Sequence, residues 1–368
     1  MKKTKLFFLL LLSSFSTIIF LFFIFLWWNE NPLLPKRSNP EITVLNVVKN
    51  NIDNSKPFII KVASYNIHFG IGFEADSPHI DKNSYIKRLD KIAQILKEID
   101  ADIVLLQEVD SFSKRSHHID QASFLALKAG YNYISQSPTL KGKVHINFHK
   151  VFGKIEHGQA ILSKYPIEYS EAIVFDYANY MPFFTKWLYD PHGAQKCVMN
   201  FNGKKINLIN LHLDPWSQDE RERQIQKIKK LWLTDKNTPT IIGGDFNSIA
   251  PAASTKDGLY LQDAPWFVDK KTFDIKNETT ISTILHLGFK EAAPLKLSLK
   301  HKRYYSYPSD DPKEKIDYIF AGYKARIIHG YIYEDAKTAS DHLPIVADIK
   351  INGNKKASHL NQIRKLAR

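Results

Sequence analysis

The stretch TIIGGDFN, residues 240–247, joins an apolar run to an acid and an amide. Threonine and isoleucine favour extended structure because their branched side chains pack well on a pleated surface. Two glycines follow, and they predict a tight turn because glycine adopts backbone conformations that other residues avoid. Asp245 and Asn247 stand directly after the run. The stretch therefore predicts a strand that delivers a carboxylate and an amide to one place.

Polar side chains recur at the ends of other apolar runs along the chain. These residues are Asn66, Glu108, His212, Asp317 and the adjacent pair Asp341–His342. Taken singly, each is explained by a solvated loop or by a turn. Taken together, they predict one cleft, because strands that pack together bring their ends to a shared edge.

Strand-like and helix-like segments alternate from residue 58 onward. Strands are predicted at Phe58–Ile67, Ile103–Leu106, Gln159–Leu162, Cys197–Phe201, Ile206–Leu213, Thr240–Ile242, Ile316–Phe320, Ala325–Tyr333 and Leu343–Ile349. Apolar residues at helical spacing predict a helix up to Ile99 with Asn83 or Ser84 as its N-cap. Ser217–Glu220 fits a capping box and predicts a second helix. Long loops are expected at 137–157, 176–195 and 250–280, and the fold class is α+β.

Seven short motifs occur in an order that is similar to one known superfamily. They are YNI (65–67), LQEV (106–109), HG with AILS (157–158 and 160–163), NLHL (210–213), GDFNS (244–248), IDYI (316–319) and SDHLP (340–344). The set resembles the endonuclease/exonuclease/phosphatase superfamily, which includes deoxyribonuclease-like enzymes, neutral sphingomyelinases and inositol polyphosphate 5-phosphatases. The resemblance implies a four-layer α/β sandwich, with two central mixed β-sheets flanked by helices.

The resemblance also implies a metal-dependent hydrolase acting on phosphoester bonds. Glu108, with Asn66 and Asp341, is expected to hold a divalent cation through oxygen. Such ligands suit Mg²⁺, and Mn²⁺ could take its place. Such an ion neutralises charge on the phosphoryl oxygens.

The remaining roles implied by the resemblance concern the attacking water and the phosphate. Asp245 would orient or deprotonate the water, and Asn247 would fix the geometry nearby. Asp317 would hydrogen-bond to His342 and favour its charged form. His212 would contact the phosphate or protonate the leaving oxygen.

Several further residues are candidates of a second tier. Glu156 and His157 are alternatives for one position, because deoxyribonuclease-like members place a glutamate there as partner of a catalytic histidine. His68 is a candidate for substrate contact, with a polar loop residue as the alternative explanation. Arg221 and Gln224 fit a family pattern, Arg-x-x-Gln, on the helix after the histidine strand.

The N-terminus carries an apolar run from Leu6 to Trp28 behind three lysines. This run is long enough to cross the hydrocarbon of a bilayer, ~30 Å thick. It predicts an N-terminal membrane anchor or signal segment over residues 1–28, so that one N-terminal transmembrane helix precedes the sandwich. Single-pass topology with an extracytoplasmic catalytic domain is expected, and secretion after signal cleavage is the alternative. Residues 29–57 are predicted to be a linker, 58–350 the catalytic domain and 351–368 a basic C-terminal tail.

Charge and cysteine content narrow the function further. The net charge is +13, but residues 1–41 carry +3 and residues 351–368 carry +5, which leaves +5 for the rest. The domain therefore lacks the strong basic excess typical of dedicated nucleic-acid binding. Cys197 is the only cysteine, which excludes a disulfide within the chain and a cysteine-based zinc site.

Three functions remain open on this evidence. A phospholipid or sphingolipid headgroup is slightly favoured as substrate, because an anchor would concentrate the enzyme at a bilayer. The aromatic stretch Tyr177–Tyr189 could reach into lipid, with a packed surface loop as the alternative. An extracytoplasmic nuclease acting on DNA or RNA is the second function, and a non-catalytic binding module is the remote third. No obligate protein partner is predicted.

Overall fold

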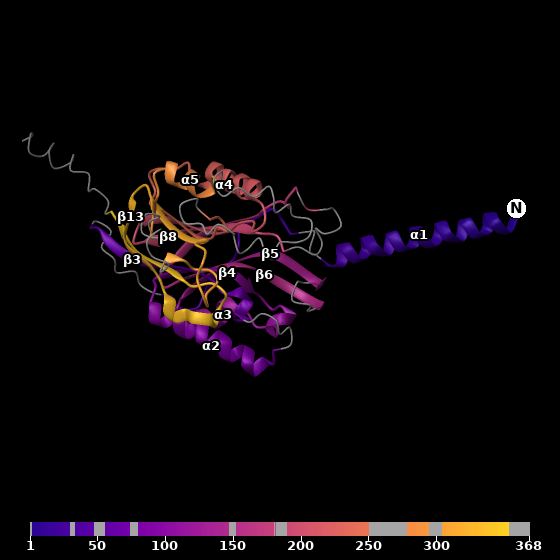
Figure 1. Cartoon of the computed structure of the whole chain (residues 1–368), viewed down its shortest axis with the longest axis horizontal. Helices are drawn as coiled ribbons and strands as arrows, with labels where there is room; N and C mark the ends of the chain where they lie inside the picture. The colour runs from indigo at the N-terminus through magenta and orange to yellow at the C-terminus, as the bar shows by residue number, and fades with distance from the viewer. Residues whose placement is uncertain are drawn as a thin grey trace, which may run out of the picture.

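Two β-sheets packed face to face form the centre of the fold, and helices cover both outer faces (Figure 1). The structure is a computed structural model that describes residues 2–29, 34–47, 56–73, 80–146, 152–179, 181, 190–249, 278–293 and 304–352. Helices α2 and α3 lie below the sheets in Figure 1, and α4 and α5 lie above them. The predicted four-layer arrangement of two mixed sheets with flanking helices is confirmed.

The first sheet contains seven strands in the described residues. In spatial order they are β1 (Arg37–Ser38), β7 (Ile167–Val174), β8 (Gly193–Phe201), β9 (Lys204–His212), β10 (Thr240–Asp245), β12 (Asp317–Gly322) and β11 (Lys290–Glu291). Only the β9–β10 pair is parallel. Because β9 and β10 run the same way while β12 runs opposite, the ends of two strands and the start of a third meet at one edge.

The second sheet also has seven strands in the part of the chain that is described. Their order is β13 (Ala325–Ile332), β14 (Ile345–Ile351), β3 (Phe58–Asn66), β4 (Ile103–Asp110), β6 (Phe152–Ser163), β5 (Tyr133–Ile146) and β2 (Ile42–Val44). The central pair β3–β4 is parallel, and its paired segments, 62–66 and 103–107, are buried. This burial explains why both strands read as continuous apolar runs, since each has a packed layer on either face.

Two helices cover the second sheet, α2 (Lys82–Ile99) and α3 (Gln121–Ala129). Helix α2 buries one stripe that includes Leu89, Ile92 and Leu96, the spacing of a single helical face. Its N-cap is Asp81, whose side chain accepts from the backbone N–H groups of Asn83 and Ser84. The predicted caps Asn83 and Ser84 are therefore wrong by two to three residues, because the carboxylate earlier in the chain already serves these N–H groups.

The first sheet is covered by α4 (Gln218–Trp232) and α5 (Thr280–His286). The predicted cap of α4 is confirmed, since the Ser217 side chain accepts from the backbone N–H of Glu220. Ile225, Ile228 and Trp232 pack on the sheet in one apolar cluster. Short 3₁₀ turns complete the described helices: η2 (His68–Gly70), η3 (Lys114–Ser116) and η9 (Glu334–Ala339).

Two segments predicted as irregular contain strands. The expected loop 137–157 is largely the β5–β6 hairpin. The outer part of this hairpin is polar and contributes little to the hydrophobic core, so it shows no apolar strand pattern in the sequence. The predicted linker 29–57 contributes the edge strands β1 and β2, one to each sheet. Edge pairing uses backbone groups, so it needs no apolar periodicity. The expected loop 250–280 lies outside the described residues up to 277.

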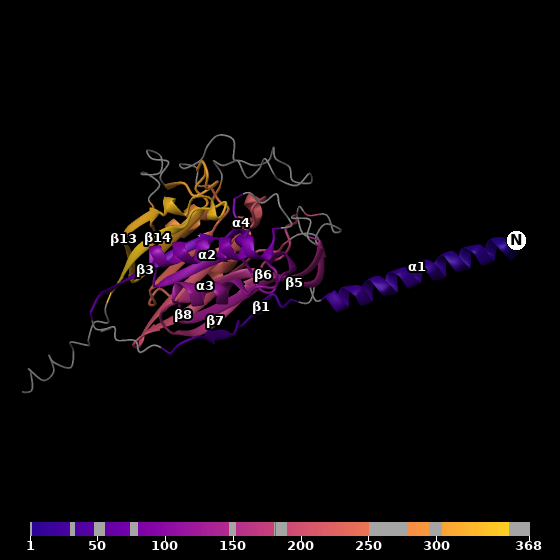
Figure 2. The same ribbon diagram turned by 90° about the horizontal axis from the view of Figure 1, so that it is seen from below.

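Helix α1 (Lys2–Asn29) extends away from the sandwich (Figure 2). Its described large side chains from Phe7 to Phe25 are exposed, with Phe8 at 66%. Over the part of the chain that is described, no helix proves long and apolar enough to cross a membrane. The predicted transmembrane helix is therefore not confirmed.

Candidate active site

Strand register brings three predicted residues into one row across the first sheet, at one end of three neighbouring strands. On β10, Asp245 is paired with His212 of β9 on one side and with Asp317 of β12 on the other. Strands in a sheet lie about 4.8 Å apart, so this row needs no loop to hold it together. Rigid strands thus fix the relative positions of two carboxylates and an imidazole.

The glycines before Asp245 act differently from the predicted tight turn. Gly243 and Gly244 lie inside β10, and Gly244 has φ +144°. A Cβ at Gly244 would come within 2.0 Å of the backbone oxygen of Leu211 on β9. The glycine is required because the neighbouring strand passes too close for a side chain.

A bulge in β4 aims Glu108 into the cleft. The register with β6 shifts between Leu106 and Val109, and Glu108 has φ +54°. Such a bulge redirects a side chain that regular alternation would place elsewhere. The preceding Gln107 points between the sheets, where its Nε2 donates to Oδ1 of Asn210 at 2.6 Å.

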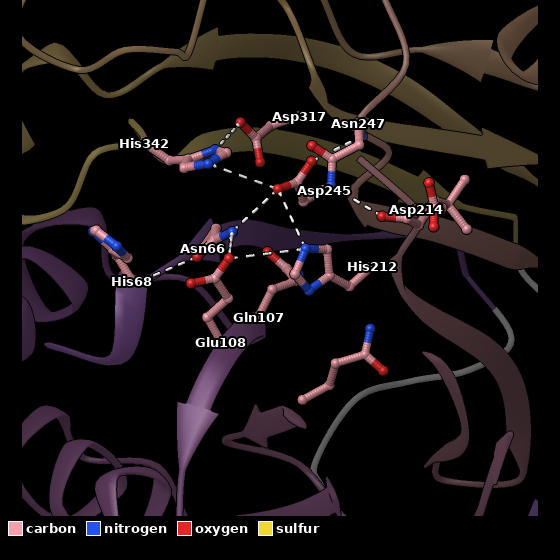
Figure 3. Close-up of polar contacts among 12 residues, drawn as sticks. Asn66, His68, Gln107, Glu108, His212, Asp214, Asp245, Asn247, Asp317 and His342 are labelled. Carbon is pink, nitrogen blue, oxygen red and sulfur yellow. Dashed lines mark hydrogen bonds and ion pairs between the residues drawn. The ribbon is translucent and has the colours of Figure 1, made fainter. Parts of the chain in front are cut away.

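Asn66 links the two sheets across the site (Figure 3). Its Nδ2 donates to Oε1 of Glu108 and to Oδ2 of Asp245, each at 3.1 Å. Its Oδ1 accepts from the backbone N–H of His68 at 3.0 Å. In this arrangement the Asn66 amide group donates to two carboxylates while its oxygen accepts from the backbone of His68.

His342 and Asp317 form the predicted pair. Nδ1 of His342 donates to Oδ2 of Asp317 at 2.8 Å, and Ser306 Oγ donates to the same oxygen at 2.6 Å. Burial alone would lower the pKa of His342, but the carboxylates of Asp317, Asp341 and Asp245 outweigh it and raise this pKa well above the usual value. His342 is therefore held as an imidazolium.

Asp245 lies between the two predicted histidines. Its Oδ2 is 3.7 Å from Nε2 of His342 and 3.7 Å from Nε2 of His212. Burial raises the pKa of Asp245 to about 7, and Asp317 adds to this while His342 opposes it. His212 behaves in the opposite way to His342: burial and the neighbouring His192 keep its pKa well below the usual value, so it is neutral.

A cleft of about 240 Å³ opens beside these groups. Its walls include Glu108 and Asp341, whose side chains are 19% and 21% exposed. The other residues are His68, Phe69, His157, Asp190, Pro191, His192, His212, Pro215 and Trp216. The aromatic stretch Tyr177–Tyr189, for which lipid contact and a packed surface loop were both open, lies largely outside the described residues.

The structure decides between the two alternatives at 156 and 157. His157 lines the cleft and lies 3.3 Å from Oδ2 of Asp190, whereas Glu156 lies 3.6 Å from Nζ of Lys141 on the neighbouring strand. Adjacent residues of a strand point to opposite faces, so only one of them can face the site. His68 also faces the cleft, with Nδ1 at 3.0 Å from the Gly72 oxygen and 3.5 Å from Oδ1 of Asp341.

Arg221 and Gln224 hold the loop that follows His212. Gln224 Oε1 accepts from the backbone N–H of Asp214 at 2.9 Å, and Arg221 Nη1 donates to the Asp214 oxygen at 3.0 Å. Arg221 also forms a fully buried ion pair with Glu278 at 2.6 Å. Asn247 closes the same region, since its Nδ2 donates to the Leu213 oxygen at 3.0 Å. Arg221, Gln224 and Asn247 therefore fix the position of the loop that follows His212 next to the site.

Gln107, Asn210 and His192 are among the residues of the region that sequence reasoning missed. Gln107 and Asn210 join the sheets, with Asn210 Nδ2 donating to the oxygens of Leu106 and Ala160 at 2.9 and 3.1 Å. Both sit inside the motifs LQEV and NLHL, so an amide within a buried strand was the available signal. His192 stacks edge-on against His212 with ring centres 4.4 Å apart, and nothing in the sequence marked it.

The residues fit a divalent cation. Burial raises the pKa of Glu108, and nearby Asp341 acts in the same direction, so a bound cation would relieve the repulsion. In the described residues, Asp245, Asp317 and His342 also offer ligand atoms that lie within 4.8 Å of one another. The donor sets are rich in carboxylate oxygen, which suits a hard ion.

Comparison with known proteins identifies the relatives of this chain. Residues 63–342 match the model of the endonuclease/exonuclease/phosphatase family. The uncharacterized protein YbhP of Escherichia coli is 25% identical over 203 residues, which cover 53% of this chain and 69% of that protein.

Solved structures share the fold at low identity. An endonuclease/exonuclease/phosphatase from Beutenbergia cavernae superposes with a TM-score of 0.55 at 17% identity, covering 80% of this chain and 72% of that one. A family protein from Leptotrichia buccalis gives 0.51 at 18% identity, covering 78% and 98% respectively.

Proposed function

The chain belongs to the endonuclease/exonuclease/phosphatase family of metal-dependent phosphoester hydrolases, and we propose that this enzyme prefers a phospholipid or sphingolipid headgroup as substrate. The observation that carries the chemistry is the row of His212, Asp245 and Asp317 on three adjacent strands, completed by His342. Three strands and the loop before β14 therefore hold close together four side chains that can orient a water molecule or hydrogen-bond to a phosphate.

In this proposal each side chain has a separate task. Asp245 accepts a hydrogen bond from the attacking water and directs it toward phosphorus. His342, held charged by Asp317, offers Nε2 to a phosphoryl oxygen. Neutral His212 stands on the other side of Asp245, where it contacts the phosphate or the leaving oxygen.

Glu108 and Asp341 are the proposed ligands of Mg²⁺, or of Mn²⁺ in its place. They line the open cleft, and Mg²⁺ keeps several water ligands, so exposed carboxylates suit it better than the buried Asp317–His342 pair. When bound, the ion supplies positive charge to the phosphoryl oxygens. Asn66 supports this set by hydrogen-bonding to Glu108.

The preference for a lipid headgroup rests on two features. The cleft combines its polar groups with Phe69, Pro191, Pro215 and Trp216, and its volume of about 240 Å³ suits a small headgroup. The exposed apolar side chains of α1 would also favour a lipid surface over water.

We further propose that α1 attaches the protein to a membrane, with the catalytic domain outside the cytoplasm. Support comes from the apolar, exposed α1 side chains and from the lysines that precede them. Protease added to intact cells or spheroplasts should digest the catalytic domain. Protection until lysis would reverse the orientation, and recovery of the intact chain in the soluble fraction would exclude attachment.

The substrate proposal is tested with the full chain purified in detergent. Hydrolysis is measured on sphingomyelin, phosphatidylinositol phosphates, DNA, RNA and bis(p-nitrophenyl) phosphate, with Mg²⁺ or Mn²⁺. Faster turnover of a lipid than of any nucleic acid supports the proposal, whereas the reverse order makes the chain a nuclease. Asp245→Ala and His342→Ala should each lower kcat at least ~10²-fold, and near-full activity of either variant would contradict the site.

A further inference from the structure

A second pocket lies between α2 and η9, outside the catalytic cleft. Its volume is about 510 Å³, within the range of small-ligand sites. Four of its nine lining residues are cationic and none is acidic: Lys87, Arg88 and Lys91 come from α2 and Lys337 from η9. The remaining residues are Gly72, Phe73, Ala336, Thr338 and Ala339.

The cations of this basic pocket have no close acidic partner among the described residues, although the exposed Glu98 and Lys91 of α2 attract each other. In the described part of the chain, no ion pair involves any of its four cations, and Arg88 Nη1 is buried without a hydrogen-bond acceptor. The acid between them in sequence, Asp90, turns the other way and pairs with Lys128 of α3 at 3.0 Å. A buried guanidinium nitrogen without an acceptor is costly, so the geometry favours an anion here.

The pocket shares a wall with the catalytic cleft. The backbone N–H of Phe73 donates to the Thr338 oxygen at 3.2 Å, which joins the segment after His68 to the segment before Asp341. Gly72 carries the oxygen next to His68 Nδ1, and a Cβ on this glycine would meet Arg88 Nη1 at 3.1 Å. The Arg88 guanidinium therefore packs against the short segment 68–72, which also holds His68 at the cleft.

We propose that the basic pocket binds a second phosphate group of the substrate, away from the bond that is cleaved. Arginine and lysine together recognise a phosphate by paired hydrogen bonds and by charge, and the four side chains surround one space. The proposal rests on the proposed function, because it assigns part of the substrate of that same site. It commits to a substrate with two phosphates, whether the second is borne by a lipid headgroup or by a nucleotide.

Direct binding tests the pocket without catalysis. Isothermal titration of the full chain with inorganic pyrophosphate is carried out in EDTA, which removes the divalent ions that would draw pyrophosphate into the catalytic cleft. Arg88→Gln/Lys91→Gln should weaken binding at least ~10-fold, whereas Lys97→Gln, a charge loss at the end of the same helix, should leave it unchanged. Equal affinity of the double variant and the wild type, or absence of binding, overturns the proposal.

Kinetics test the link to the substrate. Thymidine 5′-(p-nitrophenyl phosphate) is compared with its 3′-phosphorylated form, which differs only in a second phosphate, and an inositol phospholipid with one phosphate is compared with one carrying two. The wild type should favour the second member of at least one pair through a lower KM. The double variant should lose that preference at least ~10-fold, and an unchanged ratio contradicts the proposal. If the enzyme hydrolyses these substrates but the preference ratio is unchanged, the proposed function stands and the substrate role of the basic pocket is wrong. If the enzyme binds pyrophosphate but hydrolyses none of these substrates, the basic pocket is still an anion site, but its role in substrate binding is wrong.

Discussion

Nδ1 of His342 donates to Oδ2 of Asp317 over 2.8 Å, although 25 residues separate them in the chain. Both side chains are almost fully buried, at 6% and 1% exposure. The pair lies at the start of one strand and in the loop before another, so its geometry depends on two sheets meeting. This contact is one of the interactions that keep the imidazole of His342 positively charged.

Loss of this contact should impair catalysis more than stability. Asp317→Asn keeps the size of the side chain but removes the charge that favours the imidazolium, so kcat is expected to fall roughly 10²-fold or more. Steady-state kinetics on bis(p-nitrophenyl) phosphate measures this, with thermal unfolding as the control for folding. Wild-type kcat in a well-folded variant would show that Asp317 is only structural.

Removal of the divalent metal should abolish activity, and Glu108 should set the metal requirement. EDTA is expected to stop hydrolysis and Mg²⁺ to restore it. Glu108→Gln should raise the Mg²⁺ concentration for half-maximal activity at least ~10-fold, because a carboxylate ligand becomes a neutral amide. Lys82→Gln, remote from the cleft on α2, serves as a matched surface control. Activity that survives chelation would exclude the metal role.

The buried pair Arg221–Glu278 should be more important for stability than for chemistry. Arg221→Met leaves Glu278 buried without its partner, so the free energy of unfolding should fall by about 3–5 kcal/mol. The double variant Arg221→Met/Glu278→Gln should recover part of this loss, because no unpaired charge remains. Denaturant titration measures both, and a double variant no more stable than the single one would contradict this explanation.

Cys197 should make the stability fall at alkaline pH. Burial raises the pKa of its thiol from 9.0 to about 11, and hydrogen bonding with Ser170 and Ser135 opposes this only in part. The unfolded thiol ionises near pH 9 while the folded one stays neutral, so its contribution is complete below pH 9 and is lost between 9 and about 11. The expected loss is about 2–3 kcal/mol.

The matched variant for this test is Cys197→Ala, which has no ionisable group. Unfolding by denaturant is measured from pH 7 to 11 in both proteins. The stability of the variant should decline less steeply above pH 9. Parallel curves would mean that the thiol ionises equally in the folded and unfolded states.

Most strands, and two of the four helices that cover the sheets, α2 and α4, were predictable because their signals are local. Apolar runs marked β3, β4, β9 and β10, and the capping box marked α4. The β5–β6 hairpin and the edge strands β1 and β2 were not, since edge pairing depends on a partner strand far away in the chain. Asp81 was missed as a cap because Asn83 and Ser84, residue types equally favoured at the N-cap, follow it within one turn.

The sequence by itself determined the family and which residue types stand at strand ends, because both are written in short motifs. Only the tertiary structure decided where each side chain points. A bulge turns Glu108 into the cleft, strand alternation chooses His157 over Glu156, and register places Asp245 between His212 and Asp317. The basic pocket likewise exists only in the folded chain, since its walls come from segments more than 240 residues apart. Contacts between distant segments depend on packing and register, which no local pattern of residues encodes.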